Sequence, residues 1–341
     1  MNSSQTSTPA NNGKPFIQTK DLSKTFILRA PIVKRILGQD SEYVRAVHRV
    51  NLDIYGGEAL GLVGESGCGK TTLGRAILRL YEPDEGQILV DGEDFTEMDG
   101  AELRSMRRKL QVTFQDPYSS LNPRQRVGEI LREATLVHNI CSSDEVRDRV
   151  EYLLDTVGLG VDLADRYPHG LSGGQRQRIG LARALAVEPE FIVADEPVSA
   201  LDVSIQAQVV NLLMELQEKL DLAMLFITHD LRLVHYISHR VAVMYLGQIV
   251  EIAPSEAVFR RPLHPYSQAL LAALPKTNPR DRRSEVAIQG EPPSPINVPS
   301  GCSFHPRCPR VTDVCKVKDP ELLEVDDGRK VACHVVHQNG A

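Results

Sequence analysis

Residues 64–72 read GESGCGKTT and fit the phosphate-loop pattern G-x-x-x-x-G-K-[ST]. An apolar run at 59–63 has the length of a buried strand, and residues 73–80 follow with a helical pattern. Glycines let backbone N–H groups point inward at phosphate oxygens, and a helix N-terminus adds partial positive charge. The sequence therefore predicts an α/β nucleotide-binding fold, and the candidate contacts of this loop are Gly64, Glu65, Ser66, Gly67, Cys68, Gly69, Lys70, Thr71 and Thr72.

A second pair of candidates follows an apolar strand predicted at 191–195. Asp195 ends this strand, where a carboxylate can hold Mg²⁺ at the carboxyl edge of a parallel sheet. Glu196 comes next and is placed to polarise an attacking water. An Asp-Glu pair after a strand can also be only a helix cap. The phosphate loop upstream favours the nucleotide role, with Lys70 at the β and γ phosphates and Thr71 on Mg²⁺.

Length and composition limit the class of protein. A chain of 341 residues can hold one large α/β domain and a smaller appendage. The formal net charge of −6 gives no sign of a nucleic-acid surface. No stretch approaches the roughly eighteen apolar residues of a membrane span. Residues 1–14 lack the pattern of a secretory signal, and we expect them to form a disordered tail of a cytoplasmic protein.

The remaining pattern predicts a sheet interrupted by a helical block. Alternating and apolar runs predict strands at 16–26, 50–54, 86–90, 110–114, 191–195, 223–227, 241–244 and 248–251, the last two joined around Gly247. Residues 29–45 form a mixed basic insertion between the first two. The pattern is helical from 127 to 185 and again at 203–220, and one apolar face of the block contains Val146, Val150, Leu153, Leu154 and Val157.

The sequence Leu171-Ser172-Gly173-Gly174-Gln175 provides a second candidate anion site. A Ser hydroxyl and two glycine amides before a helical stretch can bind an anion. An ordinary Ser N-cap with a flexible approach is the alternative. An enzyme with a single phosphate loop would not need a second anion site, so this motif distinguishes the chain from simpler nucleotide-binding enzymes.

The motifs together resemble those of the ATP-binding-cassette (ABC) ATPases. The resemblance covers residues 16–252 and rests on the order and separation of the phosphate loop, Gln115, LSGGQ at 171–175, FIVADE at 191–196, SALD at 199–202 and His229. It implies a P-loop fold with a RecA-like core of mixed sheet, an antiparallel β subdomain and an inserted helical subdomain. It also implies a nucleotide-binding domain at 15–260, with its helical subdomain at about 116–186, and an extension at 261–341.

The resemblance implies a role for each matching residue. Gln115 would contact Mg²⁺ and a membrane partner, and Asp195 would hold the metal. Glu196 would be the general base, and Lys70 would act at the phosphates. His229 would touch the γ phosphate of ATP and sense its loss. A lone His before a helix is more often a cap or a surface residue, but the surrounding motifs favour the catalytic role.

The resemblance also implies that one chain cannot complete an ATP site. In the family, ATP lies between the phosphate loop of one subunit and the LSGGQ of another, so a second ABC ATPase is needed, identical or paralogous. The contacts across the two subunits would come from Ser172, Gly173, Gly174, Gln175 and Asp202. For the aromatic ring that stacks on adenine, Phe26 is favoured over Tyr43, although either can be a sheet-packing residue.

Longer strings resemble the oligopeptide/dipeptide importer branch, whose nickel importers share them. These are residues 115–124, 166–169, 261–271 and 290–295. The likeness implies the second ATPase type of a peptide importer, paired with a paralogue, two transmembrane permeases and an extracytoplasmic binding protein. It places the chain peripherally on the cytoplasmic face of the inner membrane, without nucleic acid. The alternatives are a nickel or small-solute importer, a soluble repair or translation ATPase, and a redox-sensing regulatory module.

Four cysteines near the end of the chain carry separate chemistry. Cys302, Cys308, Cys315 and Cys333 have five, six and seventeen residues between them, unlike the paired spacing of zinc fingers. Cytosolic disulfides are uncommon. Four thiolates suit an iron–sulfur cluster or, less well, zinc. In the importer branch such a tail is associated with a [4Fe-4S] cluster, and zinc or no metal are the alternatives. Cys141 lies far from these four cysteines in the sequence and is not a candidate ligand.

Overall fold

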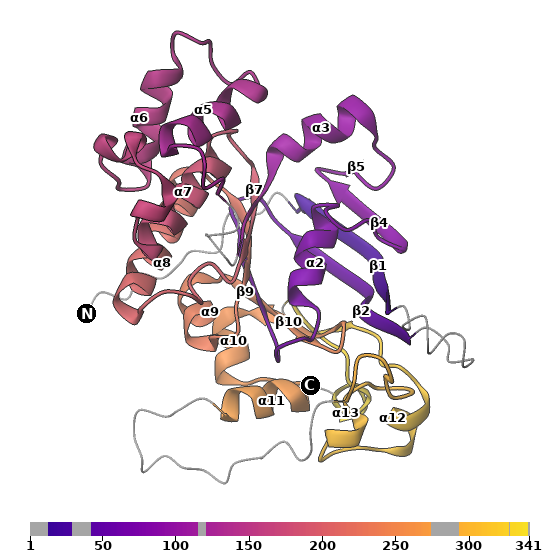
Figure 1. Cartoon of the computed structure of the whole chain (residues 1–341). Helices are drawn as coiled ribbons and strands as arrows, with labels where there is room; N and C mark the ends of the chain where they lie inside the picture. The colour runs from indigo at the N-terminus through magenta and orange to yellow at the C-terminus, as the bar shows by residue number, and fades with distance from the viewer. Residues whose placement is uncertain (1–12, 29–41, 115–120, 274–292, 327, 340–341) are drawn as a thin grey trace, which may run out of the picture. The chain divides into compact units, whose positions relative to one another are not determined.

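The computed structural model describes residues 13–28, 42–114, 121–273, 293–326 and 328–339 (Figure 1). These residues form two compact units. The first unit contains Ile54–Ala59, Glu97–Thr228 and the described end of Met1–Phe16. The second contains the described parts of Ile17–Asp53, Leu60–Thr96 and His229–Ala341. Most of the predicted tail, most of the predicted insertion at 29–45, and Gln115 lie outside the described residues.

The second unit has an antiparallel sheet near its start. Its strands follow the order β2 (Glu42–Ile54), β1 (Ile17–Leu28), β4 (Glu85–Val90) and β5 (Glu93–Asp94). Ile17 pairs with Val90 and Thr19 with Ile88, and these residues are buried. The predicted strand before Ile54 is longer than expected and takes in the end of the predicted insertion.

The same unit contains a mixed sheet. Strand β3 (Ala59–Val63) runs parallel to β9 (Arg240–Tyr245), and β10 (Gln248–Pro254) returns antiparallel to β9. The predicted hairpin around Gly247 is therefore confirmed. Two further strands, β12 (Arg329–Val331) and β11 (Leu323–Asp326), continue the sheet beyond β10. Residues near the C-terminus thus pair directly with the second strand of the hairpin.

The first unit combines three parallel strands with a group of helices. The strands are β6 (Leu110–Thr113), β7 (Phe191–Asp195) and β8 (Ala223–Ile227), each pairing with the next. Three helices lie together within this unit in Figure 1, and they are α5 (Val127–Val137), α6 (Val146–Thr156) and α7 (Gly173–Leu185). The predicted apolar face at 146–157 is buried, as expected. Helices α3 (Gly100–Lys109) and α8 (Val203–Lys219) and the 3₁₀ turns η1 (Val161–Asp165) and η2 (Pro168–Gly170) complete the unit.

The second unit carries short helices around its sheets. They are α2 (Lys70–Ile77), α9 (Leu231–Ile237), α10 (Ser255–Arg260), α11 (Pro265–Ala272), η4 (His305–Arg307), α12 (Asp313–Val317) and α13 (His334–Asn339). Helix α2 begins at Lys70 rather than at the predicted Leu73, because the loop passes straight into helical geometry after Gly69. No helix in the described part of the chain is long and apolar enough to cross a membrane.

Candidate functional site

The phosphate loop connects β3 to α2 through three glycines with positive φ. The angles are 156° at Gly64, 77° at Gly67 and 111° at Gly69. A Cβ atom on Gly64 would collide with the carbonyl oxygen of Met244, and one on Gly69 would collide with that of Ala46. Both neighbours are backbone atoms that cannot rotate away. Glycine is thus required at both ends of the loop for conformation and for space.

Lys70 is the first residue of α2, and its side chain lies against the loop. The side chain is buried, and Nζ donates to the carbonyl oxygens of Gly64 at 2.9 Å and Glu65 at 3.0 Å. Cys68 is also buried, and burial raises the pKa of its thiol. Its Sγ lies 3.9 Å from Nζ of Lys70, while its carbonyl accepts the N–H of Gly247 at 2.8 Å. The ammonium group of Lys70 is therefore fixed by two backbone carbonyl oxygens of the loop, at the start of α2.

Glu65 receives contacts from two residues far along the chain. Its backbone N–H donates to the hydroxyl of Tyr266 at 2.9 Å. Its carboxylate accepts from Nη1 of Arg307, at 3.2 Å from Oε1 and 3.1 Å from Oε2. Neither Tyr266 nor Arg307 was among the predicted site residues. No local pattern could have revealed them, because they stand 201 and 242 residues from Glu65.

Asp195 ends the central strand of the first unit, and Glu196 follows it. Asp195 is the last residue of β7 and is buried. Glu196 has φ of 45°, a left-handed conformation that is unfavourable for a side chain other than Gly, Asn or Asp. Its N–H donates to the carbonyl oxygen of Ile227 at 2.9 Å, which fixes this turn against β8. Such strain is concentrated at functional sites, where the surrounding structure imposes it.

The LSGGQ motif begins helix α7 with a capping box. The hydroxyl of Ser172 accepts the N–H of Gln175 at 3.3 Å, and Oε1 of Gln175 accepts the N–H of Ser172 at 3.0 Å. Ser172 is therefore the N-cap of α7. Binding of an anion at this helix N-terminus, which begins with two glycines, stays a prediction.

Residues of the LSGGQ and SALD motifs meet within the first unit. A Cβ on Gly173 would lie 3.2 Å from Cδ2 of Leu201, and one on Gly174 would lie 2.5 Å from Cγ2 of Ile205. Asp202 is the N-cap of α8 and its carbonyl accepts the N–H of Ile205 at 2.9 Å. The two predicted motifs thus form one packed corner of the unit.

The remaining nucleotide candidates lie in the second unit. His229 is exposed and immediately precedes α9, but the helix is capped by Asp230, whose carboxylate accepts the N–H of Arg232 at 2.9 Å. The capping alternative for His229 is thus taken by its neighbour. The ring of Phe26 is half-buried and meets Tyr81 edge to face at 5.3 Å, whereas Tyr43 is 58% exposed. Neither geometry tests which ring stacks on adenine.

The four C-terminal cysteines are all free thiols and lie near one another. The N–H of Cys302 donates to the carbonyl oxygen of Cys315 at 2.9 Å. Burial, together with the smaller effects of the neighbouring thiols of Cys315, Cys333 and Cys308, raises the pKa of Cys302 to about 12. Among the described residues, however, no group of three or more His, Cys, Asp or Glu side chains is arranged around a point that could hold one metal ion.

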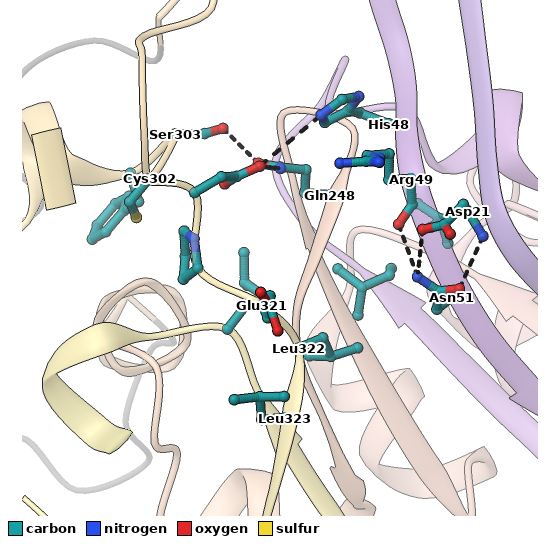
Figure 2. Close-up of a pocket in the computed structure, with 17 residues that line it drawn as sticks. Asp21, His48, Arg49, Asn51, Gln248, Cys302, Ser303, Glu321, Leu322 and Leu323 are labelled. Carbon is teal, nitrogen blue, oxygen red and sulfur yellow. Dashed lines mark hydrogen bonds and ion pairs between the residues drawn. The ribbon is translucent and has the colours of Figure 1, made fainter. Parts of the chain in front are cut away.

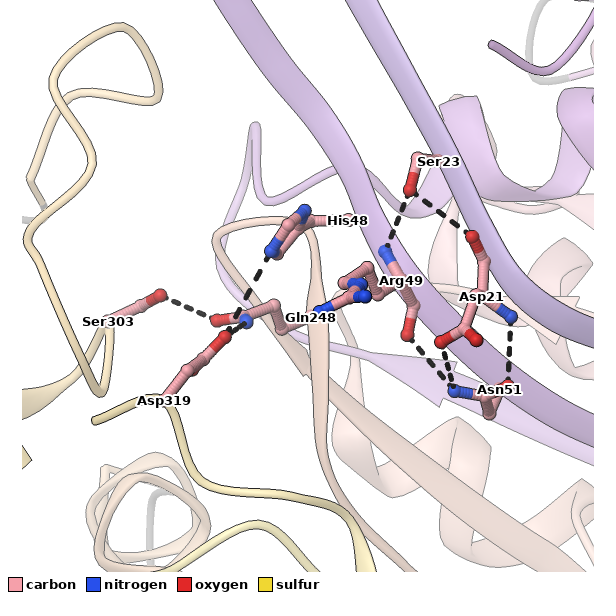
Figure 3. Close-up of polar contacts among 8 residues, drawn as sticks. All are labelled: Asp21, Ser23, His48, Arg49, Asn51, Gln248, Ser303 and Asp319. Atoms are coloured by element: carbon pink, nitrogen blue, oxygen red, sulfur yellow. Dashed lines mark hydrogen bonds and ion pairs between the residues drawn. The ribbon is translucent and has the colours of Figure 1, made fainter. Parts of the chain in front are cut away.

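A cavity of about 420 Å³ in the second unit is lined in part by Cys302 (Figure 2). Gln248 of β10 lines this cavity. Its Nε2 donates to Asp319 at 2.7 Å, and its Oε1 accepts from the hydroxyl of Ser303 at 2.6 Å (Figure 3). Since Ser303 and Asp319 both belong to the C-terminal segment, these bonds attach that segment to the mixed sheet.

Comparison with known proteins identifies the family. Residues 47–199 match the family model described as ABC transporter, and residues 250–315 match that of the oligopeptide/dipeptide transporter, C-terminal region. The oligopeptide transport ATP-binding protein AppF of Bacillus subtilis is 49% identical over 329 residues, which cover 96% of this chain and 99% of AppF. The chain belongs to the ABC transporter ATPases. As a member of this family, it is an ATP hydrolase.

Two further comparisons support the assignment to the ABC ATPases. A protein of Sinorhizobium fredii named "Probable peptide ABC transporter ATP-binding protein" is 53% identical over 292 residues, covering 86% of this chain and 83% of that protein. The dimeric ATP-binding cassette MJ0796, solved in a post-hydrolysis state with ADP and Pi, matches with a TM-score of 0.61 and 29% identity. That match covers 70% of this ABC ATPase and 98% of the cassette. The predicted P-loop fold with mixed and antiparallel sheets is confirmed.

Proposed function

We propose that this ABC ATPase powers a membrane importer of di- and oligopeptides. The observation that carries the proposal is the similarity to an oligopeptide transport ATP-binding protein over nearly the whole of both chains. The match includes the C-terminal region specific to oligopeptide/dipeptide transporters, which a repair or translation ATPase would not need. A nickel or other small-solute importer of the same branch is the second candidate, because its ATPase would carry the same motifs.

The roles we propose for the nucleotide residues follow from their chemistry. Lys70, already held at the start of α2, would exchange its carbonyl partners for the β and γ phosphates of ATP. Thr71, Asp195 and Gln115 would hold Mg²⁺, which would neutralise phosphate charge. Glu196 would accept the proton of the attacking water. His229 would contact the γ phosphate.

The proposed partners follow from the two half-sites. A phosphate loop and an LSGGQ motif on one chain serve two different ATP molecules, so we propose pairing with a second ABC ATPase, a paralogue of this chain. The dimeric cassette MJ0796 supports such a pairing. Two transmembrane permeases and an extracytoplasmic binding protein would complete the importer. This ATPase would then lie peripherally on the cytoplasmic face of the inner membrane.

We also propose the domain limits implied by the motifs. The nucleotide-binding domain would span 15–260, with a helical subdomain at about 116–186, and the extension would span 261–341. The family matches at 47–199 and 250–315 support a division into a cassette and a C-terminal region.

The four C-terminal cysteines are proposed to hold a [4Fe-4S] cluster. Mutual proximity supports the proposal, since three neighbouring thiols act on the pKa of Cys302. A cluster binds each cysteine sulfur through a different iron, so its ligands stand farther apart than those around one ion. Iron and acid-labile sulfide should therefore accompany the chain after oxygen-free purification. Full occupancy by zinc would overturn this proposal.

Uptake of labelled di- and oligopeptides, with nickel in parallel, tests the proposed cargo. Cells that depend on this chain should import peptides, and cells carrying Lys70→Ala should not, because the variant lacks the phosphate-binding ammonium. Loss of nickel uptake alone would move the protein to the metal importers. Unchanged uptake of both would favour a non-transport ATPase.

A further inference from the structure

We propose that Arg307 is a positioning residue of the ATP site, acting on the phosphate loop through Glu65. Arg307 belongs to the C-terminal segment, directly before Cys308, and lies outside every nucleotide motif. The inference rests on the proposed role of the phosphate loop in binding nucleotide. It makes the C-terminal segment part of the nucleotide machinery.

Three contacts converge on Glu65. Its carboxylate accepts from Nη1 of Arg307 at 3.1 and 3.2 Å, and its N–H donates to Tyr266 at 2.9 Å. Its carbonyl oxygen accepts from Nζ of Lys70 at 3.0 Å. A single residue therefore connects the guanidinium of the C-terminal segment to the ammonium of the loop. Displacement of Glu65 would move an oxygen that Lys70 uses.

The ion pair between Arg307 and Glu65 is shielded from water. The side chain of Arg307 is 7% exposed, and that of Glu65 is 24% exposed. Most surface ion pairs contribute little because water and salt screen them. Loss of one member of a buried pair has a larger effect, because the other charge is left without compensation. Removal of the Arg307 charge should thus displace or rearrange Glu65.

The backbone that carries Arg307 is held by aromatic packing. Phe304 is fully buried and meets Tyr245 at 5.3 Å and Tyr266 at 5.5 Å between ring centroids. The N–H of Arg307 donates to the carbonyl oxygen of Phe304 at 3.0 Å, and Nη1 of Arg307 also donates to the hydroxyl of Tyr245 at 3.4 Å. Both the backbone and the guanidinium of Arg307 are therefore fixed by hydrogen bonds.

Polar bonds attach the same segment to the mixed sheet. Ser303, directly before Phe304, donates to Gln248 of β10, and Gln248 donates in turn to Asp319 (Figure 3). The segment that carries Arg307 is thus bonded to the mixed sheet, and this attachment fixes the position of Arg307 relative to Glu65. Such fixed geometry is what a positioning role requires.

The test is binding of MgADP to the purified full-length chain, measured by titration calorimetry. Arg307→Gln should bind MgADP about tenfold more weakly than the wild type, because Glu65 loses the guanidinium that fixes its place in the phosphate loop. Arg310→Gln is the matched control, since Arg310 stands three residues along the same segment and contacts Gln268 instead of the loop. The control should bind within twofold of the wild type. Thermal unfolding of each variant establishes that it is folded.

A charge exchange separates positioning from general stability. Arg307→Glu and Glu65→Arg should each weaken MgADP binding about tenfold, and the double variant should return to within about threefold of the wild type. A folded Arg307→Gln variant with wild-type affinity would overturn the inference, as would a double variant no better than either single one. If the wild type does not bind MgADP, or Lys70→Ala binds equally well, the proposed nucleotide role itself fails.

Discussion

Two helix N-termini of this ABC ATPase are predicted to bind ATP phosphates, but they are built differently. Helix α7 is stabilised by its own first residues, since Ser172 and Gln175 cap each other. Helix α2 follows a loop whose Glu65 is held by Tyr266 and Arg307 from distant parts of the chain. The first arrangement is local and self-sufficient. The second depends on the correct packing of the C-terminal segment.

These two arrangements should differ in how well they tolerate substitution. A local cap can fail without disturbing other elements, so its loss should cost little. A loop that backbone atoms and remote side chains surround has no such freedom. Substitutions at the start of α2 should therefore be more harmful than comparable ones at the start of α7.

The largest expected effect is that of Gly69→Ala. The added Cβ would collide with the carbonyl oxygen of Ala46, and φ is 111°, so we expect a loss of about 3 kcal/mol in the free energy of unfolding. Gly174→Ala in α7 meets only the Ile205 methyl group at 2.5 Å, which can shift, and should cost about 1 kcal/mol. Urea denaturation measures both. Equal losses would contradict the expectation that the start of α2 is less tolerant than the start of α7.

A smaller effect, over the range from pH 6.5 to about 5, is expected from acid through His264. Burial lowers the pKa of His264 to about 3, while the unfolded chain takes up the proton below about 6.5. Stability is thus fully present above pH 6.5 and falls as the pH drops towards 3, by up to about 1.4 kcal/mol per pH unit. In the folded chain Nδ1 of His264 accepts the N–H of Tyr266 at 3.0 Å, and this bond is kept until the pH approaches 3.

His264→Asn isolates this titration, because Asn keeps a cap acceptor and does not titrate. Its stability should fall less steeply than that of the wild type between pH 6.5 and 4. The buried Glu251, whose pKa is raised chiefly by burial, contributes a slope of the opposite sign in both proteins. Chemical denaturation at several pH values gives the two slopes. Parallel slopes would show that His264 does not carry the effect.

The smallest expected effect is that of Ser172→Ala. The change removes the acceptor of the Gln175 N–H and should cost about 1 kcal/mol. Hydrogen exchange should quicken in the first turn of α7 and remain unchanged in α2. Ser172→Asn retains a capping oxygen and should restore most of the protection. Faster exchange in α2 as well would mean that the two helix starts are not independent.

Much of the fold could be predicted from the sequence because its central strands are apolar throughout. Strands β7 and β8 lie where the patterns at 191–195 and 223–227 predicted them. Strands β11 and β12 were not predicted, since they are short and largely polar. Their position is set by pairing, in which Val331 of β12 lies opposite Glu251 of β10. Sequence patterns near residue 330 cannot reveal a partner strand that distant.

The candidate site shows the same limit. Lys70 and Glu196 were predicted from motifs whose parts stand within a few residues of one another. Tyr266 and Arg307 act on the loop only because folding brings them to Glu65. The phosphate-loop pattern allows any residue at position 65. In this chain the carboxylate of Glu65 is needed for the contact with Arg307.

The role of Glu196 as general base is tested by the rate of ATP hydrolysis, measured for wild type and for Glu196→Gln. The chain should be assembled with the proposed second ATPase and permeases. The variant keeps the size of the side chain but lacks the base, so hydrolysis should fall at least about 100-fold. Binding of MgATP should persist, because Lys70 and the loop are unchanged. Hydrolysis by Glu196→Gln at the wild-type rate would show that Glu196 is not the general base.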